Sequence, residues 1–556
     1  MYLRTVKRKR SDGTQVAYLQ LAHNDWDSAA GHSVPRVVHS FGRADTVDRD
    51  AIARLIGSLS RLLPPGDHLA MSGTDDLEFV GSRPMGANYV LDGVWSQLGI
   101  DKTLRGLLKG RRLDPKMERV LFALVANRAV DPGSKLAATG WVTERTHIDG
   151  LADLDSDSCY RAMDWLLECE TELAESIYWA TADLLNLEVD LLFFDTTSTY
   201  FETPTADQPA DQPADGATVG FRTWGKSKDH RNDLPQIVIG MAVTRTGIPI
   251  RVWSWSGNTG DQPLIRQVKD DLADWRLGHV IWVADRGFSS AENRRYLQRA
   301  GGNYIIGEKI RGNTEAATVL ARPGRYHEIR HNMRVKEVVI DDGAARDRFV
   351  ICHNPEQAER DQTIRTQLVE RLQTAIDGTD QATHDERVAL AVGLPAAVRR
   401  YLRTTKTGLL RVDKTAIRAE TKLDGKYLLR TADPSLSAED IALGYKQLLE
   451  VERGWRDMKS TLDLRPVYHR LEDRIRAHVL LCWLALLHIR IVESRTNQTW
   501  TNLRHQLDQM HLGTFTGPAG TIRRRTATTP DQKAILAAVG LKEPADYTSI
   551  QPATPA

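Results

Sequence analysis

The sequence contains few of the residues that build disulfide-linked or zinc-bound domains. Only four cysteines occur in 556 residues, and no two of them form a C-x-x-C pair. No pair of histidines has the sequence spacing that is typical of zinc ligands. Neither a disulfide framework nor a structural zinc site is therefore indicated, and we expect a reducing, cytoplasmic environment.

Long hydrophobic runs are also scarce. The N-terminus, MYLRTVKRKRSDG, is basic but lacks the apolar stretch of a secretion signal. The most apolar run, HVLLCWLALLHIRIV at 478–492, is short and flanked by charged residues. We predict a buried helix for this run and no membrane partner.

An excess of charge of one sign is absent too, since the formal net charge is +1. The total therefore does not predict nucleic-acid binding. Basic clusters nevertheless occur at 7–10, 109–112, 225–231 and 522–525. Such clusters can contact phosphates, although each one taken singly is also typical of solvated surface.

Two isolated aspartates follow apolar runs of strand character. Asp195 lies in LLFFDTTSTYFE and Asp285 in VIWVADRGF, which predicts a carboxylate at the exposed end of each buried strand. Downstream, Tyr445, Glu452 and Lys459 are spaced seven residues apart and should lie along one stripe of a helix. Each carboxylate alone is more often a capping or surface charge, but together the three can form one site.

These motifs resemble the DDE transposases of the insertion-sequence-four family, whose third motif is Y-x2-R-x3-E-x6-K. Tyr445, Glu452 and Lys459 match it, whereas the arginine position holds Leu448. The D-T-T and D-R-G-F motifs begin at Asp195 and Asp285. With GNTGDQ and RPVYHRLEDRIRAHVLLCWLALL, the resemblance covers roughly residues 190 to 490.

The resemblance implies an α/β fold with an RNase H-like mixed-sheet catalytic core. Five predicted strands between 187 and 310, the second and third joined by a TRTG turn, agree with the strand order of that core. We predict six segments: a β-rich N-terminal module with a helix at 1–86, a helical, DNA-end-binding region at 87–187, catalytic core at 188–310, a β-rich insertion at 311–432 that contains one polar helix from about 356 to 376, catalytic core again at 433–512, and a C-terminal tail at 513–556.

The resemblance also implies metal-assisted phosphoryl transfer on DNA. Asp195, Asp285 and Glu452 would hold two Mg²⁺ ions, for which Mn²⁺ can substitute, because hard cations prefer oxygen ligands. Tyr445, Arg456 and Lys459 would bind phosphates beside the cut. The implied function is cut-and-paste transposition at the ends of an insertion sequence. The implied partners are terminal inverted repeats, target DNA and a second copy of the chain in the synaptic complex.

Two other functions compete with this one. A haloacid-dehalogenase phosphatase also places an Asp after an apolar strand, but it requires D-x-D, and the second position here is Thr197. A catalytically silent transposase-like DNA-binding protein, such as a transposition inhibitor, would share the fold and stays open as the alternative.

One match to a nucleotide-binding pattern is rejected. Gly220, Gly225, Lys226 and Ser227 fit G-x-x-x-x-G-K-[ST], which requires a strand before it and a helix after it. Here the repeat ADQPADQPADG at 206–216 precedes the match, and KDHRNDLPQ follows it. We therefore expect a basic loop and no nucleotide cofactor.

Overall fold

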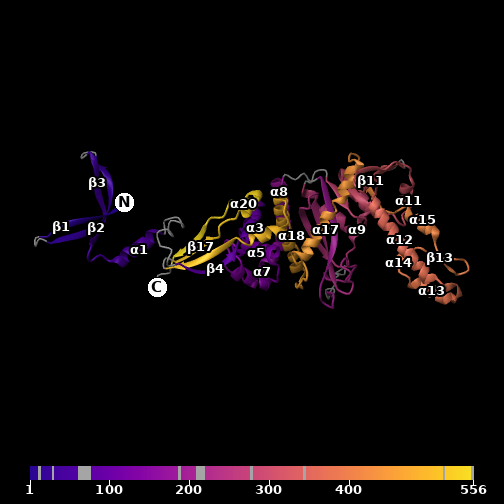
Figure 1. Ribbon diagram of the computed structural model, residues 1–556, viewed down its shortest axis with the longest axis horizontal. Helices are drawn as coiled ribbons and strands as arrows, with labels where there is room; N and C mark the ends of the chain where they lie inside the picture. The colour runs from indigo at the N-terminus through magenta and orange to yellow at the C-terminus, as the bar shows by residue number, and fades with distance from the viewer. Residues whose placement is uncertain are drawn as a thin grey trace. The chain divides into compact units, whose positions relative to one another are not determined.

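The protein is shown in Figure 1 as a computed structural model, which describes residues 1–10, 14–27, 31–60, 77–185, 190–207, 220–275, 280–341, 346–517 and 520–552. Two compact units are present. One comprises Met1–Arg83, Met510–Ala527 and Pro544–Ala556, and the other comprises Pro84–Gln509 and Thr528–Glu543.

The first unit contains two antiparallel sheets. Its N-terminal sheet has the order β1-β2-β3 and is followed by α1, which confirms the predicted β module and helix: β1 (Tyr2–Lys9), β2 (Gln15–Asp27), β3 (His32–Arg43) and α1 (Arg49–Ser60). Its second sheet has the order β18-β17-β16-β4, with β4 (Glu78–Pro84), β16 (His511–Gly517), β17 (Gly520–Arg525) and β18 (Tyr547–Pro552).

The segment predicted as a C-terminal tail is folded. It supplies β17 and β18 to the second sheet, and α20 (Pro530–Val539) to the other unit. In β17, Gly520 and Ile522 are buried and alternate with partly exposed residues, as expected for a strand with one covered face. The strand β4, which completes this sheet, comes from far upstream in the sequence, so local sequence could not reveal the pairing.

The second unit begins with the predicted helical region. Its helices are α3 (Gly86–Gln97), α4 (Ile100–Leu108), α5 (Met117–Val130), α6 (Lys135–Gly140), α7 (Ser156–Glu168) and α8 (Glu170–Leu185). The helices α3, α5 and α7 pack on α18 (Glu472–Thr496), which also contacts the sheet strand β7 (Pro249–Ser256). A further helix, α19 (Trp500–Leu507), follows α18.

The helix α18 is longer than the sequence suggested. Its 25 residues would be long and apolar enough to cross a membrane, but 94% of its most apolar window is buried inside the protein. The helix therefore forms the core between the helical region and the sheet, which confirms the prediction of a buried helix.

A mixed sheet of nine strands forms the centre of the second unit, in the order β10-β11-β12-β15-β9-β8-β5-β6-β7. The structure contains all five strands predicted for the catalytic core. They are β5 (Leu191–Tyr200), β6 (Gln236–Thr244), β7, β8 (Ile281–Ala284) and β9 (Asn303–Glu308). The strands β5, β6 and β7 are antiparallel, whereas β5, β8 and β9 are parallel. The crossovers between parallel strands contain α9 (Asp261–Asp271) and α10 (Ala291–Leu297).

The insertion at 311–432 differs from the prediction of a β-rich segment, because helices make up a large part of it. Its strand β15 pairs with β9, so its longer strands extend the central sheet. This pairing covers the edge of β9, whose backbone groups would otherwise lack partners. The elements are α11 (Thr314–Ala321), β10 (His327–Arg330), β11 (Met333–Asp341), β12 (Arg346–His353), α12 (Pro355–Ile376), α13 (His384–Gly393), α14 (Ala396–Arg399), β13 (Leu402–Thr404), β14 (Leu410–Val412), α15 (Lys414–Thr421) and β15 (Lys426–Thr431).

The third motif occupies two helices, α16 (Ala438–Lys446) and α17 (Leu449–Ser460), rather than the one continuous helix that was predicted. Ser437 caps α16, where its Oγ accepts from the Asp440 backbone N–H at 3.0 Å. Between the helices, Gln447 N–H donates to Gly444 O and Leu448 N–H to Tyr445 O, both at 3.0 Å. These tighter, three-residue bonds interrupt the regular helix, so the seven-residue spacing alone does not align Tyr445 with Glu452.

Candidate active site

Asp195 and Asp285 are held side by side by two parallel strands. Phe194 of β5 is the partner of Ala284 of β8, and each aspartate follows one of these paired residues. Neighbouring strands lie about 5 Å apart, so the two carboxylates leave the sheet close together. Asp285 lies at a strand end, as predicted. Asp195 does not, since β5 continues to Tyr200 alongside β6.

Glu452 faces the two aspartates across a cleft of about 340 Å³, named here the carboxylate cleft. The helix α17 packs on β5 and β6, and α16 packs on β8 and β9. The three predicted carboxylates and Tyr445 therefore line one space. The sequence did not predict the rest of the lining, which includes Asn332, Met333, His353, Asn354 and Tyr427 from the insertion.

Burial and neighbouring charges control the ionisation of Asp195. Burial raises the pKa of the Asp195 carboxyl to about 6, and the nearby charges of Asp285 and Asp261 act in the same direction. The Lys228 ammonium and the Thr196 backbone N–H oppose this increase. Lys228 Nζ donates to Thr196 O at 2.7 Å and lies 3.4 Å from Asp261. Lys228 belongs to the basic cluster at 225–231, but nothing in the sequence connected it with Asp195.

Tyr445 orients one of the aspartates. Its hydroxyl donates to Asp285 Oδ1 at 3.1 Å, and its ring stacks on Tyr427 with centroids 6.0 Å apart. Burial raises the pKa of the Tyr445 hydroxyl above its usual value. Gly307 of β9 provides the space, because a Cβ there would lie 2.4 Å from the Tyr445 hydroxyl oxygen. The structure thus joins Tyr445 to the carboxylates.

The two basic residues predicted to bind DNA differ in their surroundings. Lys459 Nζ lies 2.8 Å from Thr197 Oγ1 and 2.9 Å from Asp229 Oδ1, and burial lowers its pKa. Arg456 is exposed and makes no ion pair among the described residues. Leu448, at the position of the family arginine, is 9% exposed and lines the carboxylate cleft.

A second cleft of about 500 Å³ shares Asp285 with the first and is named here the cation cleft. Five basic residues line it: Lys226, Lys228, Arg286, Lys309 and Arg311. Asp261 and Asp285 are its two carboxylates. The site therefore combines an acidic cleft with an adjacent basic one, which suits a polyanionic substrate.

The loop that fits the nucleotide pattern has another structure. No helix follows Ser227 within the described segment 220–235. Gly225 packs against a neighbouring loop, since a Cβ there would lie 2.0 Å from Gly257 O. The glycine is therefore explained by close backbone packing, and Lys226 lines the cation cleft. Residues 208–216 of the preceding repeat lie outside the described residues.

The carboxylate set suits a hard divalent cation. Among the described residues, no three Asp, Glu, His or Cys side chains are grouped closely enough to bind a metal as they stand. However, Asp195, Asp285 and Glu452 offer oxygen donors around one cleft. The raised pKa of Asp195 also shows that its charge lacks full compensation there, which a bound cation would supply.

The Transposase DDE domain family matches residues 192–487. No match is found among curated proteins. Among solved structures, the piggyBac transposase synaptic complex with hairpin DNA is 12% identical, with a TM-score of 0.35 over 76% of this chain and 78% of that one. The Mos1 transposase paired-end complex with the left transposon end is 15% identical, with a TM-score of 0.15 over 37% of this chain and 57% of that one.

Proposed function

This chain belongs to the Transposase DDE domain family, and we propose that it catalyses cut-and-paste DNA transposition, cutting the ends of an insertion sequence and joining them to target DNA. One observation carries the proposal: Asp195 and Asp285 each follow one residue of the paired Phe194 and Ala284 on two adjacent parallel strands, and both line one cleft with Glu452. The strand order β7-β6-β5-β8-β9 supports an RNase H-like core. The D-T-T and D-R-G-F motifs support membership of the insertion-sequence-four group.

In this proposal, Asp195, Asp285 and Glu452 hold two Mg²⁺ or Mn²⁺ ions, which supply activation of the attacking oxygen and charge neutralisation at the leaving oxygen. The sheet fixes the positions of Asp195 and Asp285, and the Tyr445 hydroxyl orients Asp285. Lys228 offsets the negative charge around Asp195 and Asp261. The basic residues of the cation cleft attract the phosphates of the strand to be cut.

The proposed partners follow from this chemistry. Terminal inverted repeats and target DNA are the substrates, two copies of the chain pair the ends, and the helical region at 87–187 binds the end sequence. The alternative is a catalytically silent transposase-like protein that binds the same DNA. The intact set of three carboxylates favours the active enzyme.

The deciding experiment uses the purified chain, duplex oligonucleotides carrying the inverted repeats that flank its gene, and Mg²⁺ or Mn²⁺. We expect nicks at the repeat ends and strand-transfer products in the absence of any nucleotide, because phosphodiester exchange requires no triphosphate. Binding of the repeats without cleavage in either metal would instead support the silent DNA-binding protein.

Arg456 and Lys459 should respond differently to substitution. Arg456→Gln should make the slope of log affinity against log salt less steep by about 0.9, the change for one phosphate contact, because the Arg456 guanidinium is exposed and has no ion pair among the described residues. Lys459→Gln should mainly destabilise the protein, by about 1–3 kcal/mol, because it removes the hydrogen bonds to Thr197 and Asp229. The loss stays moderate because Asp229 keeps its ion pair with Arg465. Fluorescence anisotropy at several salt concentrations and thermal unfolding measure these effects. A normal Tm with a reduced salt slope for Lys459→Gln would contradict the structural role.

A further inference from the structure

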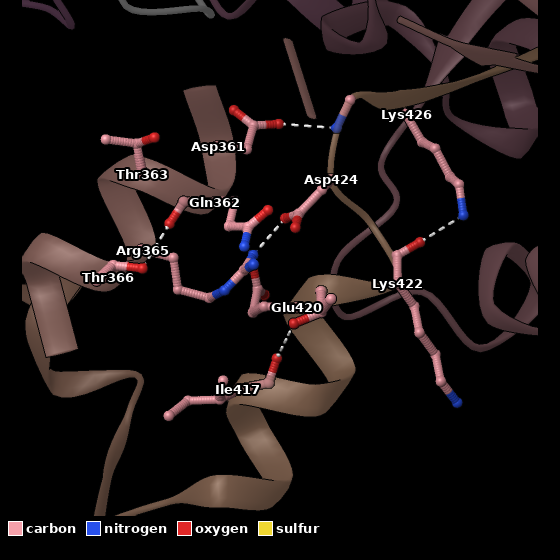
Figure 2. A network of polar contacts seen from close by, with 12 residues as sticks. Asp361, Gln362, Thr363, Arg365, Thr366, Ile417, Glu420, Lys422, Asp424 and Lys426 are labelled. Atoms are coloured by element: carbon pink, nitrogen blue, oxygen red, sulfur yellow. Dashed lines mark hydrogen bonds and ion pairs between the residues drawn. The ribbon is translucent and has the colours of Figure 1, made fainter. Parts of the chain in front are cut away.

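Residues 355–425 form a compact excursion from the central sheet, named here the insertion subdomain. It leaves after β12 and returns at β15, and Figure 2 shows the contacts that fasten its base. Gly425 N–H donates to Asp361 Oδ2 at 2.8 Å, and Arg365 pairs with Asp424. Asn354 N–H donates to Gly425 O at 2.8 Å, so the entering and leaving segments are held side by side.

The insertion subdomain has its own hydrophobic core. Side chains from α12, α14 and the β13–β14 hairpin form it: Leu372, Ile376, Val398, Tyr401 and Leu410. Arg411 of the hairpin also pairs with Asp380 at 2.7 and 2.8 Å. The hairpin and the helices around it are therefore held in a defined arrangement, and side chains on their surface keep fixed relative positions.

Basic residues gather in the second half of this subdomain, whereas its first half, residues 355–395, contains four Lys or Arg and eight Asp or Glu. Residues 396–426 contain nine Lys or Arg and three Asp or Glu, whereas the whole chain has a net charge of +1. Five of these cations are exposed and make no ion pair among the described residues: Arg403, Lys406, Lys414, Arg418 and Lys422. Like charges held together on a folded surface repel one another, and binding of a polyanion removes that cost.

The basic surface connects with the cation cleft. Arg311, which lines that cleft, donates from Nε to both carboxylate oxygens of Glu420 in α15, at 3.1 and 2.9 Å. Arg400 at the end of α14 lies 3.8 Å from the same carboxylate. The cation cleft is therefore linked to residues 396–426 through Glu420, whose carboxylate both Arg311 and Arg400 contact.

We propose that residues 396–426 form a clamp for the backbone of duplex DNA, which holds phosphates beyond the cleavage position. The proposal rests on the proposed function, because the carboxylate cleft beside the cation cleft is what identifies the polyanion as DNA. The exposed side chains of the hairpin are Arg403, Thr404, Lys406 and Thr407. Arginine, lysine and threonine contacts to phosphate position a duplex without reading its bases, so the clamp is independent of sequence.

The test compares a charge-removing variant, Arg403→Gln/Lys406→Gln/Lys414→Gln, with the charge-preserving variant Arg403→Lys/Lys406→Arg/Lys414→Arg. Both are measured in the full chain by anisotropy over a range of salt, on a long duplex that extends past the repeat end and on a short duplex that stops at it. For the charge-removing variant we expect about 10- to 100-fold weaker binding of the long duplex and a salt slope smaller by about 2 to 3. The charge-preserving variant should match the wild type, and the short duplex should bind equally well to all three proteins.

Several outcomes would overturn the clamp. An unchanged salt slope on the long duplex would do so, as would an equal loss of affinity on the short duplex. Polyglutamate serves as a probe for an acidic protein partner. If the charge-removing variant lost its binding to polyglutamate but kept its affinity for DNA, the surface would bind an acidic protein instead. Wild-type cleavage is measured in parallel, so absence of all cleavage would count against the proposed function, while the affinity comparison still tests the clamp.

Discussion

Asp195→Asn, Asp285→Asn and Glu452→Gln should each reduce DNA cleavage by about 10³-fold or more, while affinity for the DNA ends stays within a few-fold of the wild type. Each substitution replaces a charged oxygen ligand by an amide of nearly equal volume, so it weakens cation binding with little change in packing. A loss of 10³-fold corresponds to about 4 kcal/mol of transition-state stabilisation. Cleavage of labelled repeat-end duplexes and anisotropy measure the two quantities.

A matched control lies on the same helix as Glu452. Glu450 is two residues away and interacts with Arg453 at 3.8 Å, and it does not line the carboxylate cleft. Glu450→Gln should therefore cleave like the wild type. Near-normal cleavage by any one of the three variants would remove that residue from the catalytic set. Equal loss in Glu450→Gln would point to damage of α17 rather than to loss of a ligand.

Asp195→Asn should also stabilise the metal-free protein at neutral pH. The ordinary pKa of an aspartate is about 3.9, and burial raises that of Asp195 to about 6 in the folded state. Below about pH 4 the carboxyl is protonated in both states and costs nothing. As the pH rises to about 6, the unfolded chain ionises first, so the wild type loses stability. The full cost, about 3 kcal/mol at most, persists above that pH.

Denaturant unfolding of wild type and Asp195→Asn in EDTA, between pH 4 and pH 8, measures this effect. The variant should gain stability over the wild type as the pH rises, and the gap should level off above about pH 6. Other groups titrate in both proteins and cancel in the difference. Addition of Mg²⁺ at pH 8 should narrow the gap, since a cation that binds only the folded wild type stabilises it. A gap that does not change with pH would show that Asp195 is not destabilised by burial.

The sequence located the candidate carboxylates because each lies in a local pattern. Asp195 and Asp285 follow runs of buried strand residues, and Glu452 lies at a fixed spacing from Tyr445 and Lys459. The same kind of local pattern predicted β5 to β9, the helices between 87 and 187, and the buried helix α18. Periodicity is a property of neighbouring residues, so it can be read without knowledge of the fold.

Local patterns failed where distant segments meet. The insertion was predicted to be β-rich with one polar helix, which is α12. The helices α13 to α15 were not predicted; they fold with α12 around a common core, and β15 joins the insertion to β9 through hydrogen bonds between residues far apart in sequence. The segment at 513–556 was predicted only as a C-terminal tail, but β17 and β18 pair in a sheet that β4 completes. These strands are short and polar, and their partners rather than their own residues determine their structure.

The sequence by itself determined which residues can perform the chemistry: two aspartates after apolar strand segments, and a glutamate with a lysine and a tyrosine at helical spacing. Only the tertiary structure decided how those groups are used. It bonds Tyr445 to Asp285, pairs Lys459 with Asp229, gives Arg456 no ion pair within the described segments, and brings Lys228 to the neighbourhood of Asp195. These properties depend on burial and on contacts between separate elements, and both arise only when segments that are not neighbours in the sequence pack together.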